Sequence, residues 1–168
     1  MRSTLLVTAA VLSVGYASLS FAAGGGGGGG SDSVSSAFPA KPVDPNFARA
    51  KQLIEARDYR NALPLLQQVV AKDPKNADAY NLMGYATRSA GDPNGSLQYY
   101  QQALAIDPRH LGAHEYIGEA YLMLNRPQDA KQHLARLDSL CVFGCSEYRQ
   151  LKAAIAAYEK QPGPRASN

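Results

Sequence analysis

Residues 77–110 have the sequence ADAYNLMGYATRSAGDPNGSLQYYQQALAIDPRH, and this stretch decides the fold. Its apolar residues recur at steps of three and four, which is the period of an amphipathic helix. The break Ala90-Gly91-Asp92-Pro93 ends a first helix. Pro108 ends a second helix, because proline lacks an amide hydrogen and disfavours helix just before it. The stretch therefore predicts two helices joined by a short turn.

The same pattern recurs along the chain at a spacing of 34 residues. The recurring positions are small Ala50, Gly84 and Gly118; small Ala62, Ser96 and Ala130; bulky Leu66, Tyr100 and Leu134; and Asp73-Pro74 with Asp107-Pro108. Small side chains mark where two helices of a unit cross, since they let the backbones approach closely. One helix pair cannot bury its apolar face, so stacked neighbouring pairs supply the core.

The stretch 80–84, Tyr-Asn-Leu-Met-Gly, resembles the tetratricopeptide-repeat (TPR) consensus. The chain as a whole resembles a small exported bacterial protein of that family. Further matching positions are Ser96, Tyr100, Ala103, Leu104 and Pro108. Residues 43–76 and 111–144 match more weakly: Asn46, Tyr80 and His114 stand at the usual tryptophan position, and Val142 replaces a proline. The resemblance implies an all-α solenoid of about three helix pairs over residues 45–160, with units at 43–76, 77–110 and 111–144.

One more step of the register predicts a single helix over residues 146–160, without a partner helix after it. Tyr148, Leu151, Ile155 and Tyr158 form its apolar stripe, which we expect to pack on the third pair. Ser146 is the expected N-cap. The stretch is thus interpreted as a C-terminal capping helix.

The N-terminus has the pattern of an export signal. Arg2 precedes an apolar stretch, residues 5–21, and Ser20-Phe21-Ala22 provides the small-x-small cleavage pattern. Serine, threonine and glycine interrupt the stretch, which argues against a membrane anchor. We therefore expect a signal peptide at residues 1–22 and an exported, periplasmic or secreted protein.

Two segments flanking the repeats are expected to lack a packed structure. Residues 23–44 contain seven consecutive glycines and a Ser/Pro-rich run, which cannot bury enough apolar surface to offset the entropy of ordering. We interpret this segment as a flexible arm, and residues 161–168 as a disordered tail. No segment after residue 22 is apolar enough to cross a membrane.

The charge of the chain is close to balanced, with 17 Lys and Arg against 14 Asp and Glu. The basic residues are scattered between acidic ones, whereas nucleic-acid binding demands a concentrated basic stripe. Nucleic acid is therefore not an expected partner, and no cofactor is indicated.

Cys141 and Cys145 are the only cysteines, and export favours their pairing. They replace an Asp-Pro turn at equal length, so a disulfide staple is the leading interpretation. A redox-active pair and a soft-metal site remain alternatives, although two thiolates need further metal ligands.

His110 and His114 have the i, i+4 spacing of metal ligands on a helix, but they also occupy a loop end and a packing position. Packing is the favoured interpretation, and no metal site is predicted. No Ser-His-Asp, Cys-His or His-Glu-x-x-His arrangement is present. Catalysis is not indicated.

The family resemblance implies a concave groove lined by the first helix of each unit. Carried over residue by residue, the partner-binding positions are Lys51, Asn81, Tyr85, Arg88, Glu115 and Glu119, with Phe47, Ile54 and Leu122 beside them. This mixture of aromatic, polar and charged side chains suits a peptide segment. The leading hypothesis is a non-enzymatic adaptor that binds a protein of the cell envelope. The alternatives are a thiol-redox or metal-handling protein, and a repeat module that only dimerises or fills space in a larger complex.

Overall fold

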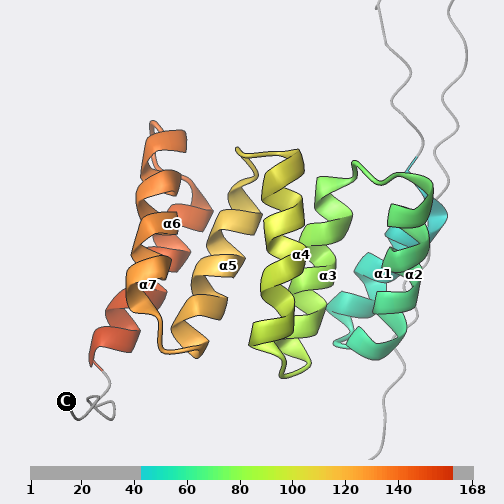
Figure 1. The fold of residues 1–168 in the computed structure, drawn as a ribbon, viewed down its shortest axis with the longest axis horizontal. Helices are drawn as coiled ribbons and strands as arrows, with labels where there is room; N and C mark the ends of the chain where they lie inside the picture. The colour runs from blue at the N-terminus through green and yellow to red at the C-terminus, as the bar shows by residue number, and fades with distance from the viewer. Residues whose placement is uncertain (1–42, 161–168) are drawn as a thin grey trace, which may run out of the picture. The chain divides into compact units, whose positions relative to one another are not determined.

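The computed structural model describes residues 43–160, in which seven helices and no strands occur (Figure 1). The helices are α1 (Pro45–Glu55), α2 (Tyr59–Lys72), α3 (Ala77–Ser89), α4 (Pro93–Ile106), α5 (Leu111–Met123), α6 (Pro127–Leu140) and α7 (Ser146–Lys160). The predicted all-α fold, with about three helix pairs and a final single helix, is confirmed. The predicted signal peptide, the arm up to residue 42 and the tail lie outside the described residues.

Side-chain caps explain where most helices begin. Asp58, Asn76 and Asp92 each accept a hydrogen bond from the amide three residues further on, at 3.3, 2.9 and 2.7 Å. Such caps satisfy amides that have no partner inside the helix. Asp44 caps α1 by accepting from the amide two residues further on, at 2.8 Å, and it also forms an ion pair with Lys72 at 3.3 Å. Asp44, which the sequence placed at the end of the arm, thus contacts the helical domain.

The turn inside each helix pair repeats with the sequence. Arg57, Gly91 and Asn125 have positive φ angles of 59°, 101° and 57°, and they follow one another at the 34-residue spacing. Glycine adopts this conformation without steric cost, and asparagine tolerates it. The turn geometry is therefore common to all three pairs, even though only one of them carries glycine.

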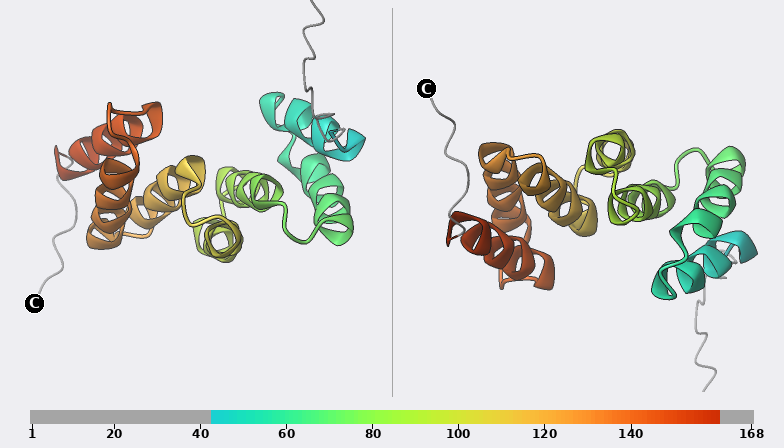
Figure 2. Two further views of the ribbon diagram at one scale, coloured as in Figure 1. Left: turned by 90° about the horizontal axis from the view of Figure 1, so that it is seen from above. Right: turned by 90° about the horizontal axis from the view of Figure 1, so that it is seen from below.

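The helices pack as antiparallel pairs that follow one another in chain order (Figure 1, Figure 2). Within a pair, α1 contacts α2, α3 contacts α4, and α5 contacts α6. Between pairs, the first helices meet: α1 contacts α3, α3 contacts α5, and α5 contacts α7. One side of the array is thus formed by α1, α3, α5 and α7.

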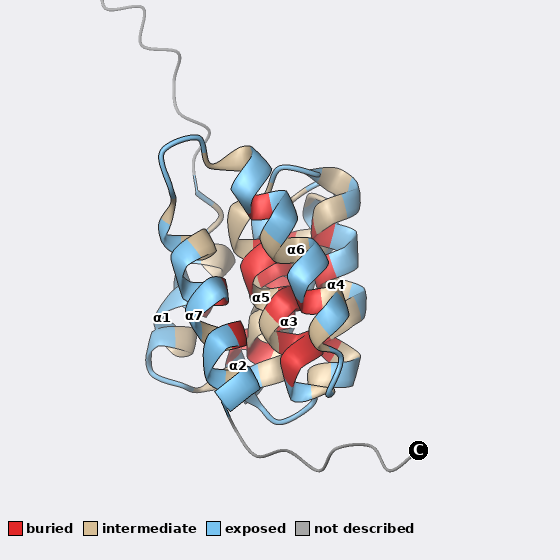
Figure 3. Cartoon of the chain, turned by 90° about the vertical axis from the view of Figure 1, so that its left-hand side faces the viewer, coloured by how far each residue is buried: buried red, intermediate tan, exposed pale blue. Residues whose placement is uncertain are grey.

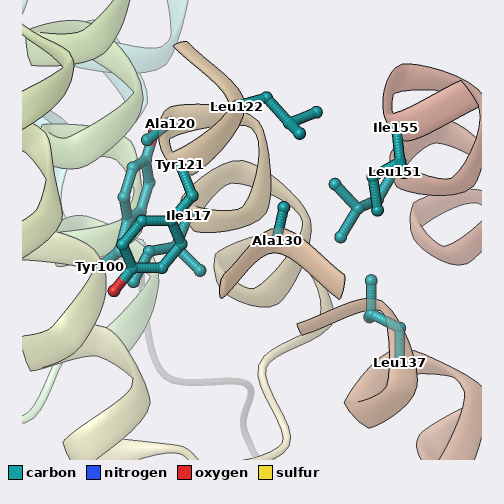
Figure 4. Close-up of a cluster of buried hydrophobic side chains, with 9 residues drawn as sticks. All are labelled: Tyr100, Ile117, Ala120, Tyr121, Leu122, Ala130, Leu137, Leu151 and Ile155. Atoms are coloured by element: carbon teal, nitrogen blue, oxygen red, sulfur yellow. The ribbon is translucent and has the colours of Figure 1, made fainter. Parts of the chain in front are cut away.

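Buried positions gather on the sides of the helices that face one another, and exposed positions lie outside (Figure 3). One core cluster joins α1, α2 and α3, and a second joins α4 to α7. The second cluster contains Tyr100, Ile117, Ala120, Tyr121, Leu122, Ala130, Leu137, Leu151 and Ile155 (Figure 4). The final helix contributes Leu151 and Ile155, so it closes the core as predicted.

Two glycines mark close helix approaches. A methyl group at Gly84 would stand 2.5 Å from the ring of Tyr100, which places α3 directly against α4. At Gly118 it would stand 2.6 Å from a methyl carbon of Leu151, on α7. The predicted crossing at Gly84 is therefore present, and Gly118 makes room for the final helix.

The predicted N-cap of α7 is wrong by one residue. Ser146 is the first residue of the helix, and its hydroxyl donates to Glu147 at 3.0 Å. The amide of Tyr148 instead points at the sulfur of Cys145, 3.4 Å away. Because Cys145 is held next to Cys141, its sulfur occupies the capping position that serine would otherwise take.

Candidate functional site

Three neighbouring cavities lie along the first helices of the pairs. The first, about 210 Å³, is lined by Phe47, Lys51, Asp78, Asn81 and Leu82. The second, about 340 Å³, is lined by Ile54, Glu55, Arg57, Tyr59, Leu82, Tyr85 and Tyr116. Leu82 borders both cavities, so they adjoin. We call the surface formed by these two cavities and the third, described below, the groove.

Arg88 connects the second cavity to the third. Its guanidinium carbon lies 5.6 Å from the ring centroids of both Tyr85 and Tyr116, which line the second cavity. It forms an ion pair with Glu119 at 2.7 Å, and its Nε donates to the hydroxyl of Tyr100 at 3.3 Å. Cation–π contacts and a charge-assisted hydrogen bond thus fix this side chain across α3, α4 and α5.

A row of tyrosines forms the wall of the second cavity. The rings of Tyr59 and Tyr85 are 6.3 Å apart in an edge-to-face arrangement, and those of Tyr85 and Tyr116 are 5.1 Å apart. Burial raises the pKa of Tyr116, so its hydroxyl stays protonated at neutral pH. Rigid aromatic side chains of this kind supply large contact areas at protein interfaces. The sequence indicated Tyr85 but not Tyr59 or Tyr116.

The third cavity, about 550 Å³, lies between the C-terminal halves of α5 and α7. Its lining residues are Arg88, Glu119, Leu122, Met123, Asn125, Ala154, Ala157 and Tyr158. Charged groups stand at one end, and apolar side chains of two helices form the walls. The hydroxyl of Tyr158 donates to the side-chain oxygen of Asn125 at 3.3 Å and joins α7 to the turn after α5.

Two of the predicted contact residues are more deeply buried than the others. Asn81 is 7% exposed, and its side-chain oxygen has no hydrogen-bond partner among the described residues. Glu115 is 3% exposed and does not line any of the three cavities. Burial raises the pKa of Glu115 to about 7, with Glu119 and Glu147 adding to the shift and Arg88 opposing it.

The structure therefore distributes the six predicted contact residues unequally. Lys51 and Asn81 line the first cavity, Tyr85 lines the second, and Arg88 and Glu119 line the third. Glu115 lies behind this surface. The equivalent position one repeat earlier, Asn81, is buried as well.

His110 and His114 do not meet at a shared site. His110 caps α5 by accepting the amide of Ala113 at 3.1 Å, and its Nε2 lies 3.1 Å from Asp78. His114 pairs with His133 instead, with 2.9 Å between their Nδ1 atoms. Nε2 of His114 donates to the carbonyl of Pro108 at 3.1 Å, so its Nδ1 accepts the proton of His133.

The histidine pair favours neutral rings. Burial lowers the pKa of His133 to about 4, with His114 adding to the shift, and burial likewise lowers the pKa of His114. Within residues 43–160, no three His, Cys, Asp or Glu side chains come together in a way that could hold a metal ion. The helices of this same range include none that is long and apolar enough to cross a bilayer.

The two cysteines are adjacent in space. Their Cα atoms lie 5.5 Å apart, which is within the range that a disulfide spans. Between them, Val142 and Phe143 are 83% and 100% exposed. Gly144 has a φ of 76°, so the tight turn uses the conformational freedom of glycine.

Comparison with solved structures identifies proteins of similar fold. MamA from Desulfovibrio magneticus RS-1 is 26% identical with a TM-score of 0.55, over 56% of this chain and 54% of that chain. This chain thus spans about half the length of MamA. The first TPR of RPAP3, solved with an HSP90 peptide, is 16% identical with a TM-score of 0.60, over 68% of this chain and 90% of its own.

The type III secretion chaperone SycD of Yersinia enterocolitica is 14% identical with a TM-score of 0.60, over 67% of this chain and 85% of that one. At such identities, the likeness to RPAP3 and SycD shows the fold alone. No curated protein matches the chain at a significant level.

Family models agree with the helix pairs described above. One tetratricopeptide-repeat model matches residues 47–110, and another matches residues 88–155. Together they cover the three helix pairs and the first part of α7. The chain therefore belongs to the tetratricopeptide-repeat family.

Proposed function

We propose that this protein is a non-enzymatic scaffold whose groove binds an extended segment of a partner protein. One observation carries this proposal: the three cavities follow one another along α1, α3, α5 and α7 and are lined by tyrosines and by charges of both signs. Such a surface can bind a peptide through aromatic contacts and orient it through charged groups. The peptide-bound structure of RPAP3 supports the proposal, because it is an example of this fold with a bound peptide.

We also propose that the protein acts after export, as a periplasmic or secreted protein. The small-x-small pattern at Ser20-Phe21-Ala22 supports this location. N-terminal sequencing of the exported protein should then begin near Ala23. Recovery of the intact N-terminus in a membrane fraction would contradict the cleavage.

An oxidising location would favour a structural disulfide between Cys141 and Cys145. Closing a loop of this length stabilises a fold by roughly 2 kcal/mol in the chain-entropy treatment. Titration of free thiols in the exported protein should detect none. Two reactive thiols in that fraction would instead support the thiol-redox alternative.

The binding proposal is tested by selecting random 12-residue peptides displayed on phage against the purified full-length chain. We expect peptides whose affinity falls about tenfold or more for Tyr85→Ala, because an aromatic contact at the centre of an interface dominates binding. Phe143→Ala is the matched control, since it removes an exposed aromatic ring that lines none of the three cavities.

Thermal melts establish that both variants remain folded. Failure to select any peptide would overturn the proposal. Equal losses of affinity for Tyr85→Ala and Phe143→Ala would also overturn it, because the binding surface would then not be the groove.

A further inference from the structure

Of the ion pair that lines the third cavity, the carboxylate is more exposed than the guanidinium. Arg88 is enclosed by the rings of Tyr85 and Tyr116 and by the hydroxyl of Tyr100, and its side chain is only 13% exposed. The side chain of its ion-pair partner Glu119 is 27% exposed. A ligand entering this cavity therefore meets the acidic member of the pair more readily than the basic one.

A second carboxylate lies behind Glu119 without a partner. Glu115 is one helical turn earlier on α5, and no hydrogen bond or ion pair reaches it from the described residues. Glu147, at the start of α7, is also close enough to act on its charge. Buried carboxylates are normally paired, because removing them from water is costly.

The nearby cations of α7 do not supply that partner. Arg149 donates to the carbonyl of Gly144 at 3.3 Å, and Lys152 lies over the ring of Tyr148. Arg88 pairs with Glu119 and is the cation that acts on Glu115, so among the described residues one cation serves two carboxylates here. The local balance is acidic and would be neutralised by an added positive charge.

The remaining walls of the cavity are apolar. Leu122 and Met123 line it from α5, and Ala154 and Ala157 line it from α7. Met123 is 52% exposed, so its side chain is accessible to a ligand in the cavity. The cavity thus combines an apolar channel with an acidic end.

We propose that this cavity binds a long cationic side chain, lysine or arginine, of the partner segment. The aliphatic stem lies along Met123 and the two alanines, and the charged head reaches Glu119 with Glu115 behind it. Lysine and arginine are the side chains that combine an apolar stem with a cationic head. The inference rests on the proposed function and adds to it the chemistry of the partner.

The proposal has a consequence for the pH dependence of binding. The pKa of Glu115 is about 7, because burial, Glu119 and Glu147 raise it while Arg88 lowers it. Glu115 is therefore neutral in most of the molecules at pH 6 and ionised in most of them at pH 8. The affinity for a cationic side chain should rise over this range.

The test uses the peptides selected from the random library. We expect lysine and arginine to be enriched over the unselected library. For a selected peptide, Glu119→Gln should weaken binding about fivefold, the usual scale for a partly exposed charge pair. Glu115→Gln, which keeps the size of the side chain, should weaken binding at pH 8 and remove its increase between pH 6 and pH 8.

Glu159→Gln is the matched control. Glu159 is a carboxylate of α7 that pairs with Lys131 at 2.7 Å and does not line the cavity, so this variant should bind like the unmodified protein. Thermal melts of Glu119→Gln check that the loss of its ion pair has not unfolded the chain. If Glu119→Gln is unfolded, Glu115→Gln provides the test instead.

Each outcome of the selection decides the inference. Peptides that depend on Tyr85 but lack basic residues, or are enriched in acidic ones, would overturn the cationic preference and leave the proposed function standing. Absence of any selected peptide would overturn both. Basic peptides unaffected by Glu119→Gln and Glu115→Gln would show that their charge is recognised elsewhere, and the assignment to this cavity would be wrong.

Discussion

Replacing Gly84 with leucine is expected to destabilise the fold by about 3 kcal/mol, the upper range for overpacking a core. The first added carbon would already lie 2.5 Å from the ring of Tyr100, which is fully buried. The ring cannot swing away freely, because its hydroxyl is bonded to Arg88. Replacing a glycine inside a helix stabilises the fold by only about 1 kcal/mol, so the cost of the clash is larger than this gain. Thermal melts should show a decrease of roughly 10 °C in Tm.

A matched pair of alanine variants separates the clash from the general effect of losing glycine. Gly84→Ala should melt below the unmodified protein. Gly112→Ala adds the same methyl group to α5, where its nearest neighbour would be 3.4 Å away, so its Tm should be equal or higher. Equal Tm values for the two variants would mean that α3 and α4 do not approach each other as closely as described.

Acidification is expected to destabilise the protein through the histidine pair. We expect a loss of about 2 kcal/mol in the free energy of unfolding, a value reduced because His133 is partly exposed and solvent weakens the effect. The pKa of His133 is lowered to about 4 from an ordinary value of 6.5, and that of His114 is lowered as well. Unfolded chains therefore bind more protons than folded ones between these values. The contribution of the neutral histidine pair to stability is fully present above about pH 6.5 and is lost as the pH falls towards 4.

Replacement of His133 by asparagine tests this origin of the acid sensitivity. An asparagine amide can donate to Nδ1 of His114 in place of the imidazole but does not titrate. Denaturant unfolding at pH 7 and pH 4.5 should therefore differ less for His133→Asn than for the unmodified protein. Gln132→Asn, an exposed change at the neighbouring position of α6, should retain the full acid response. An unchanged pH dependence in His133→Asn would show that other groups cause the loss.

The sequence predicted the fold because the repeat carries its own packing rules. Gly84 faces the large ring of Tyr100, and the equivalent residues one repeat earlier, Ala50 and the smaller Leu66, belong to one core cluster. Such paired sizes at a fixed spacing indicate which positions of the two helices face each other. The same spacing located the apolar stripe of the final helix, since Leu151 and Ile155 are buried.

The site was less predictable, because its contacts join residues with no fixed spacing. His133 meets His114 across a helix pair, and Tyr59 comes from a second helix to meet Tyr85 on a first helix. The repeat register says nothing about such pairs. It also treated Glu115 as a groove residue like Asn81, although Glu115 is 3% exposed and lines none of the three cavities.

The central claim, that the groove is the binding surface, is tested most directly by mapping where a selected peptide contacts the protein. The measurement is a titration of the isotope-labelled full-length chain with the tightest-binding peptide, followed by amide chemical shifts in solution NMR. We predict that the largest shifts fall on α1, α3, α5 and α7, around Lys51, Tyr85, Arg88 and Glu119. Shifts confined to α2, α4 and α6, or to the loop between Cys141 and Cys145, would contradict the account.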